Sequence, residues 1–158
     1  MKRVFDEDPW TIDIKWSRPK AYAAVVADKS GTEDDASLYS ILARYRSGPR
    51  KLFYVGKTFS YFVSTRLSQR DHKARLAKFV QAHPRHSFEV SYGVIKCTKL
   101  TRKRLGEIEQ LLIYSSDPVH SKNVRNFYDH CVSDAYHIRN NGSRCSLPKT
   151  IALGVFVG

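Results

Sequence analysis

A glutamate on the apolar side of a predicted helix is the residue of this sequence that most suggests chemistry. The segment after Thr101 has apolar side chains at helical spacing, which at about 100° per residue form one broad arc. The arc consists of Leu105, Ile108, Leu111, Leu112 and Ile113. Glu109 falls inside this arc, between the directions of Leu112 and Ile113, whereas Glu107 falls on the polar face. A carboxylate on a buried face is costly unless it is paired, hydrogen-bonded or bound to a metal.

Two interpretations of Glu109 follow from the residue alone. The first is an internal ion pair, with one of the many arginines as the partner. The second is a ligand for a hard cation, because carboxylate oxygens suit Mg²⁺ or Mn²⁺. A single protein carboxylate is sufficient when substrate phosphate and water supply the remaining ligands. The second interpretation predicts a metal site at Glu109.

The charge of the chain favours a polyanionic partner. Twenty-seven Lys and Arg against fifteen Asp and Glu give a formal net charge of +12, which creates a positive field. The basic residues form two groups in the sequence, namely Arg66, Arg70, Lys73, Arg75 and Lys78, and then Lys96, Lys99, Arg102, Lys103 and Arg104. Arg70, Lys73, Arg102 and Lys103 are the predicted nucleic-acid contacts. Charge alone does not separate DNA from RNA or from an anionic membrane.

Composition narrows the class of protein further. A chain of 158 residues suits one domain with a hydrophobic core. No apolar run reaches the length of a bilayer span, and the acidic residues and Pro9 that follow the first basic residues do not fit a signal peptide. The three cysteines, Cys97, Cys131 and Cys145, are far apart and form no paired motif. These features predict a cytoplasmic protein with reduced thiols and no membrane contact.

The elements that must position Glu109 are predicted from periodicity and turn residues. Residues 37–43 and 51–56 are rich in β-branched and aromatic side chains and flank a Gly-Pro turn, which predicts a β-hairpin. Residues 62–82 are helical in pattern, as one helix or as two that meet near Asp71, a candidate cap. Alternation predicts a strand over residues 88–94, and Thr101 is expected to cap a helix that ends at Asp117.

The ends of the chain are predicted to be extensions of this core. Residues 11–16 alternate like a short strand, and the acidic loop 28–35 follows. In the tail, residues 123–137 are compatible with a helix, residues 141–142 with a turn and residues 150–157 with a closing strand. The expected fold is α+β, with a small central antiparallel sheet flanked by helices in the order β-β-α-β-α. The expected divisions are an N-terminal extension (1–35), the core (36–125) and a C-terminal extension (126–158) packed on it.

Five separate elements of the sequence, taken in order, resemble the GIY-YIG nuclease superfamily. Leu38-Tyr39, followed after fifteen residues by Tyr54-Val55-Gly56, is similar to the paired signature that names the family. Residues 66–72 resemble its arginine-to-histidine helix, residues 108–113 resemble its glutamate helix, and Asn123 lies where a characteristic asparagine is expected. The resemblance covers residues 37–125, and the family's core has the β-β-α-β-α order predicted above.

The resemblance implies hydrolysis of a DNA phosphodiester by an activated water and one divalent ion, Mg²⁺ or Mn²⁺. In this scheme Glu109 binds the metal and Tyr39 is the general base, with its ionisation favoured by the positive charge of Lys57. Tyr54 positions the water or the phosphate, and it could exchange roles with Tyr39. Arg66 stabilises the negative transition state. His72 assists at the phosphate, and Asn123 supports the architecture.

The sequence departs from the family pattern in its first motif, in its hairpin turn, which is somewhat longer than usual, and in the helix that follows Arg66. The first motif is Ser37-Leu38-Tyr39, so its glycine is absent. The second helix residue of the family often stands four positions after the arginine, which here is Arg70. His72, at six positions, requires a bend near Asp71. Arg70 and His72 are therefore both candidates for this role.

The function expected from these observations is that of a stand-alone endonuclease of the restriction type. A homodimer on DNA is one expected form, because cutting both strands needs two sites. Two alternatives remain open. One is a non-catalytic nucleic-acid-binding module on the same fold, which the altered first motif allows. The other is a nuclease or toxin directed at RNA. Metal-dependent cleavage of DNA and RNA separates the three possibilities.

Overall fold

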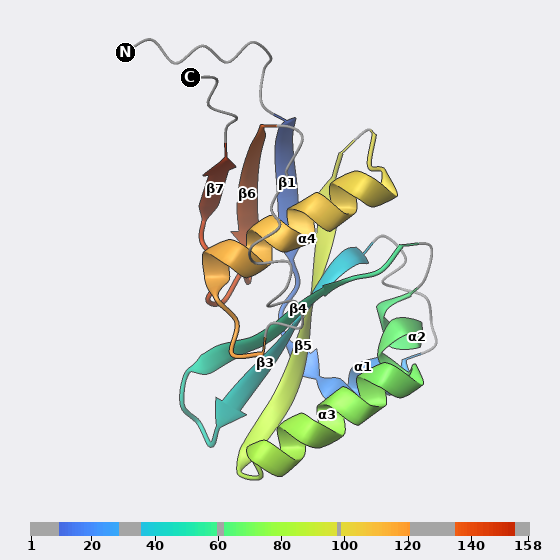
Figure 1. Ribbon diagram of the computed structural model, residues 1–158. Helices are drawn as coiled ribbons and strands as arrows, with labels where there is room; N and C mark the ends of the chain where they lie inside the picture. Colours follow the sequence, from blue (N-terminus) through green and yellow to red (C-terminus); the bar gives the residue numbers. More distant parts are fainter. Residues whose placement is uncertain (1–9, 29–35, 60–61, 98, 121–134, 154–158) are drawn as a thin grey trace.

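The protein, described by a computed structural model over residues 10–28, 36–59, 62–97, 99–120 and 135–153, has the expected α+β composition (Figure 1). The helices are α1 (Tyr22–Ala27), α2 (Val63–Leu67), α3 (Arg70–Ala82) and α4 (Arg102–Ser116). The strands are β1 (Trp10–Trp16), β2 (Lys20–Ala21), β3 (Ala36–Tyr45), β4 (Arg50–Lys57), β5 (His86–Lys96), β6 (Tyr136–Gly142) and β7 (Thr150–Leu153). Within the part of the chain described, no helix is both long and apolar enough to cross a bilayer.

All strands belong to one mixed sheet, in the order β4-β3-β5-β1-β6-β7, with β2 paired to β5. The expectation of an antiparallel sheet is wrong at one place, because β1 and β6 run parallel. β1, predicted as a short strand in an N-terminal extension, lies between β5 and β6 in the sheet. The strand is held there because Ile12, Ile14 and Trp16 alternate with polar residues and are all buried. The N-terminal segment is therefore part of the sheet.

The β3–β4 hairpin confirms the strands predicted around the Gly-Pro turn, and it contains a β-bulge. Ile41 pairs with Tyr54 and Leu42 pairs with Leu52, which leaves Phe53 as an extra residue on β4. A bulge of this kind turns two consecutive side chains toward the same side of a strand. Phe53 and Tyr54 accordingly pack in the same hydrophobic cluster. The bulge thus sets the direction in which Tyr54 points.

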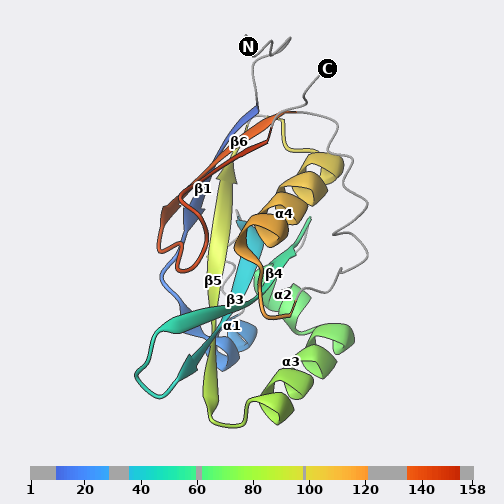
Figure 2. The same ribbon diagram turned by 60° about the vertical axis from the view of Figure 1, so that its left-hand side comes forward.

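Two hydrophobic cores lie on the two sides of β3. The α4-side core is built from β1, β3, β4, β6 and α4, with Ile14, Leu38, Leu52, Val55, Leu105, Ile108 and Leu112 among its members. The α3-side core contains Tyr22, Tyr39, Ile41, Tyr54, Val63, Leu67, Phe79 and Tyr92. Figures 1 and 2 show α4 over one part of the sheet, while α1, α2 and α3 gather at another, beside the lower part of β5. Alternate residues of β3 therefore serve different cores.

The segment 62–82 consists of two helices, which confirms one of the two predicted possibilities. α2 ends at Leu67 and α3 begins at Arg70. The residue that caps α3 is Gln69, and Asp71 lies in the first turn, so the prediction of Asp71 as a cap is wrong by two residues. In α4 the predicted cap is confirmed, because the Thr101 side chain accepts a hydrogen bond from the backbone N–H of Arg104.

Glu107 is not on a solvated face, in contrast to the prediction from the helical wheel. The residue is buried, and its carboxylate accepts a hydrogen bond from the hydroxyl of Tyr136. Tyr136 belongs to β6, which a single-helix analysis of residues 102–116 does not include. The strand covers a part of α4 that the helical wheel predicts to be exposed to solvent, and the hydrogen bond from the Tyr136 hydroxyl compensates for the burial of the carboxylate.

The last two residues of the helix predicted in the tail are part of a strand, β6. Tyr136 and His137, the last residues of the predicted helix 123–137, belong to β6, and residues 121–134 lie outside the part described. The buried Asn140 fixes the strand, because its amide oxygen accepts from Trp16 Nε1 at 2.9 Å and its amide nitrogen donates to the Pro148 carbonyl at 2.8 Å. β7 confirms the closing strand as far as Leu153. Of the cysteines described, Cys97 and Cys145 are free thiols.

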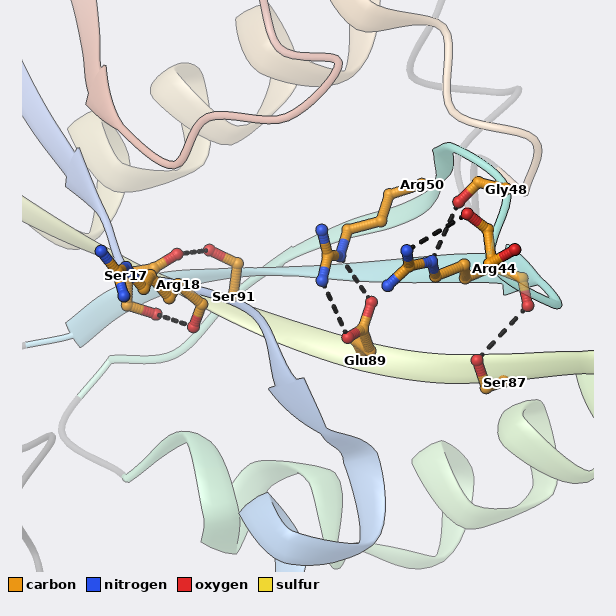
Figure 3. A network of polar contacts seen from close by, with 9 residues as sticks. Ser17, Arg18, Arg44, Gly48, Arg50, Ser87, Glu89 and Ser91 are labelled. Atoms are coloured by element: carbon orange, nitrogen blue, oxygen red, sulfur yellow. Dashed lines mark hydrogen bonds and ion pairs between the residues drawn. The ribbon is translucent and has the colours of Figure 1, made fainter.

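A polar network ties the far end of the hairpin to β5 (Figure 3). Arg50 on β4 donates two hydrogen bonds to the Glu89 carboxylate on β5, at 2.6 and 3.2 Å, and so reaches across β3. Arg44 donates to the Gly48 carbonyl within the turn at 2.9 Å. Arg50 and Glu89 form a bidentate ion pair that supports the sheet, away from the tyrosines described below.

Candidate active site

Tyr39 and Tyr54 lie side by side on neighbouring strands of the hairpin. Their ring centroids are 6.1 Å apart, and both residues are buried in the α3-side core. Tyr54 pairs with Ile41, two positions after Tyr39, and residues two apart on a strand face the same side. The spacing of the two tyrosines in the sequence, read through this register, therefore brings both rings to one place.

Gly56 makes this arrangement possible. It is the cross-strand partner of Tyr39, and a Cβ atom at this position would lie 2.4 Å from Tyr39 Cζ and 2.8 Å from Tyr54 Cε1. Both distances are shorter than any van der Waals contact, so the Tyr39 ring occupies the space of the missing side chain. The glycine of the Tyr-Val-Gly motif is thus needed for packing between the two rings.

Gly56→Ala is expected to destabilise the protein by about 1–3 kcal/mol, because the added methyl group must displace buried rings. Urea unfolding at neutral pH measures the effect. Gly106→Ala is the matched control, since a Cβ there meets Lys57 Nζ at an ordinary 3.5 Å. Alanine also favours the helix, so this control is expected to be neutral or stabilising. Equal stability of Gly56→Ala and the wild type would contradict the packing role.

His72 is the helix residue that joins the two tyrosines. Its side chain is 1% exposed, and its ring centroid lies 5.9 Å from that of Tyr39 and 6.4 Å from that of Tyr54. The Tyr39 hydroxyl is 3.5 Å from His72 Nδ1 and 3.4 Å from Nε2. The break between α2 and α3 supplies the bend that this position requires. Arg70, the other candidate, is exposed at the start of α3.

Arg66 lies at the end of α2, beside the start of α3. Its guanidinium donates a hydrogen bond to the Gln69 side chain and lies 3.7 Å from Asp71 Oδ2. Its positive charge acts to lower the pKa of both Tyr39 and Tyr54, so it is within electrostatic reach of the two hydroxyl groups. The structure thus places Arg66 near the tyrosines, held by polar contacts to the helix junction.

Arg75 is a member of this cluster that the sequence reasoning missed. Its Nη1 is 2.9 Å from His72 Nδ1, and its guanidinium carbon lies 4.5 Å from the centroid of the Tyr54 ring. In the sequence it is one of five basic residues in its group, and nothing distinguishes it from the exposed Lys73 and Lys78. Its position three residues after His72, on the same side of α3, is the signal that could have identified it.

Glu109 forms an ion pair with Lys57, whose Nζ lies 2.6 Å from Glu109 Oε2. The pairing expected for an internal ion pair is therefore present, with a lysine instead of an arginine. Lys57 is the cross-strand partner of Leu38, and both face the α4-side core, whereas Tyr39 and Tyr54 face the α3-side core. Lys57 and Tyr54, three positions apart on β4, face opposite sides of the strand, and the positive charges that act to lower the pKa of Tyr39 are those of Arg66 and Arg75.

The tyrosine hydroxyls are in an environment that disfavours ionisation. Burial is the largest cause of the raised pKa of Tyr39, which lies well above the ordinary value, and the neighbouring Tyr54 raises it further. Burial also raises the pKa of Tyr54, and here Arg75 is the strongest opposing charge. Glu109 raises the pKa of both hydroxyls. The carboxylate is therefore electrostatically coupled to both tyrosines.

A hard cation would find one protein ligand here. Glu109 offers a carboxylate with 11% side-chain exposure, and Lys57 already contacts one of its oxygens. The described residues contain no cluster of three or more His, Cys, Asp or Glu side chains suited to a metal. The residues present fit a divalent ion only if phosphate and water complete its shell, as Mg²⁺ commonly requires. Asn123 lies outside the described residues, and Arg70, Lys73, Arg102 and Lys103 are all exposed.

Comparison with known proteins gives no assignment for this arrangement. No family model, curated protein or solved structure matches the chain.

Proposed function

We propose that the protein is a divalent-metal-dependent endonuclease that hydrolyses DNA phosphodiester bonds, with the cluster around Tyr39 as its active site. The observation that carries the proposal is the convergence of Tyr39, Tyr54 and His72 from two strands and a helix, with Arg66 and Arg75 beside them. Hydroxyl, imidazole and guanidinium groups in one place are the groups that phosphodiester hydrolysis uses. The net charge of +12 supports a polyanionic substrate.

In this proposal each buried side chain of the cluster has a separate role in the reaction. Tyr39, in its ionised form, takes the proton from the attacking water, and Tyr54, whose ring centroid lies 6.1 Å from that of Tyr39, orients that water. Arg66 and Arg75 oppose the burial that raises the pKa of both hydroxyls, and Arg66 stabilises negative charge on the phosphate. His72 keeps the two rings in place. Exposed Arg70, Lys73, Arg102 and Lys103 bind the DNA backbone.

Glu109 is the residue that would hold the metal in this proposal. When bound, Mg²⁺ or Mn²⁺ would supply a counter-charge for the scissile phosphate and the leaving oxygen. Lys57 neutralises the carboxylate in the described state, and its side chain is 40% exposed, so it can move into water when a cation binds. Lys57 is therefore expected to compete with the metal for Glu109.

Digestion of supercoiled plasmid and of structured RNA, each with Mg²⁺, Mn²⁺, Ca²⁺ or EDTA, tests the proposal. The expected result is nicking or linearisation of DNA that needs Mg²⁺ or Mn²⁺, stops with EDTA and returns when the metal is restored. Sequencing of the ends then reports discrete sites for a restriction-type enzyme. Cleavage of RNA alone would change the assigned substrate from DNA to RNA. Cleavage of neither substrate with any metal would overturn the proposal.

The Lys57–Glu109 ion pair favours one other function, a non-catalytic nucleic-acid-binding module. A carboxylate that serves only to neutralise a lysine needs no metal, and the basic surface alone binds phosphates. Such a module would shift plasmid DNA in a gel with strong salt dependence and leave it uncut under every metal condition above.

A further inference from the structure

Arg75 occupies a central position among the ring side chains of the site. It contacts His72 within α3 and covers the ring of Tyr54 on β4. Its charge also acts to lower the pKa of Tyr22 on α1, which burial raises to about 12. The guanidinium therefore lies within electrostatic reach of three tyrosines from three different elements, Tyr22, Tyr39 and Tyr54. Arg75 is therefore placed to control how the neighbouring rings are oriented.

The contact between Arg75 and His72 determines where the imidazole carries its proton. A guanidinium has only N–H donors, so His72 Nδ1, at 2.9 Å from Arg75 Nη1, must act as an acceptor. A neutral imidazole with an accepting Nδ1 has its proton on Nε2. An imidazolium would direct an N–H against another N–H at this contact. The pair is therefore compatible with only one of the three protonation forms of the ring.

The surroundings of Nε2 agree with this arrangement. His72 Nε2 lies 3.8 Å from Asp71 Oδ2, an acceptor that favours an N–H on that side of the ring. The Tyr39 hydroxyl, at 3.4 Å from Nε2 and 3.5 Å from Nδ1, faces the edge of the ring between the two nitrogens. Arg66, whose guanidinium is 3.7 Å from Asp71 Oδ2, is the other charged group beside this contact.

We propose that Arg75 is a positioning residue that holds His72 as the neutral Nε2–H tautomer and fixes the ring of Tyr54 from its face. This consequence rests on the reaction proposed above: His72 then acts as a hydrogen-bond donor through Nε2 and does not remove the proton of Tyr39. A histidine whose accepting nitrogen is occupied by a guanidinium is unsuited to be the base. Tyr39 loses its own proton to bulk solvent before the reaction, and its ionised oxygen then accepts the proton from water, so the imidazole remains neutral.

The tautomer is measured directly by two-bond ¹H–¹⁵N spectra of the full chain labelled at histidine, at neutral pH and without DNA. The wild type is expected to show the Nε2–H pattern for His72. Arg75→Met, which keeps the length of the side chain but has no donor, is expected to give a mixture of tautomers. Arg75→Lys restores a donor and is expected to recover the wild-type pattern. Lys78→Met, an exposed substitution on the same helix, serves as the control.

Two results would overturn this inference. One is an Nδ1–H or doubly protonated His72 in the wild type, which needs no variant and holds even if Arg75→Met does not fold. The other is an unchanged Nε2–H pattern in folded Arg75→Met. Neither measurement depends on cleavage, so the inference and the nuclease proposal fail separately. If the wild type cleaves DNA, Arg75→Met should lower kcat by up to about 100-fold with little change in KM, and Arg75→Lys should recover part of it.

Discussion

Glu109→Gln is expected to lower metal-dependent cleavage about 10²–10³-fold, the loss typical of removing one group that stabilises charge in a transition state. The amide keeps the size of the side chain, but it is a poor ligand for Mg²⁺ and carries no charge. Binding of Mn²⁺, followed by its paramagnetic resonance signal in the presence of DNA, should weaken in parallel. Plasmid nicking under single-turnover conditions gives the rate.

Two further variants separate a metal ligand from a structural ion pair. Glu89→Gln removes another carboxylate that is paired with a cation, Arg50, and it is expected to leave cleavage unchanged. Lys57→Met removes the competitor for Glu109, so it should lower the concentration of metal needed for cleavage. If Glu109 serves only to neutralise Lys57, the two substitutions Glu109→Gln and Lys57→Met would have the same effect. Equal cleavage by wild type and Glu109→Gln would disprove the metal role.

Tyr39→Phe is expected to reduce cleavage by about 10²–10⁴-fold, the range attributed to a positioned general base. The substitution removes only the hydroxyl and keeps the ring that packs against Gly56, so the fold and DNA binding should be retained. Binding is measured by fluorescence anisotropy with a labelled duplex and cleavage by plasmid nicking. Retained cleavage in Tyr39→Phe, with loss in Tyr54→Phe, would assign the base to Tyr54.

The pH dependence of the wild type tests the same assignment. Burial raises the pKa of Tyr39 well above about 10, so the base form is a small fraction at neutral pH and increases about tenfold per pH unit. The logarithm of kcat/KM should therefore rise with a slope of about one from pH 7 to pH 9. Tyr136→Phe, which removes an equally buried hydroxyl outside the site, is the control and should keep this slope. A flat profile would exclude a tyrosine base.

The parts of the fold that the sequence predicted are those whose pattern is local. The hairpin, the helix capped by Thr101 and the strand around Val90 each carry their own periodicity and turn residues, so no distant partner is needed to identify them. β6 was missed because its burial depends on β1 and α4, which lie far away in the sequence. Glu107 was placed on the wrong side for the same reason, since a helical wheel does not include the strand that covers it.

The candidate site shows the same division between local and distant information. Tyr39, Tyr54 and His72 could be named because motifs mark them, and the structure brings their rings together. The motif suggested that Lys57 acts on Tyr39, whereas the alternation of β4 predicts that Lys57 and Tyr54 face opposite sides, and the Lys57 amino group pairs with Glu109. Arg75 carries no motif, and only its contacts with His72 and Tyr54 distinguish it from other basic residues. Which tyrosine is the base remains a prediction.

The parallel pairing of β1 with β6 has a consequence for how the chain acquires its structure. Trp16 and Asn140, which join the two strands, are 124 positions apart. During synthesis from the N-terminus, the edge of β1 that pairs with β6 therefore stays unpaired until residues 136–142 have been made. Closing so long a loop is slow compared with forming the local hairpin. A waiting strand edge is also open to other chains, so early β1–β5 pairing makes the nascent protein most vulnerable to aggregation just before β6 is made.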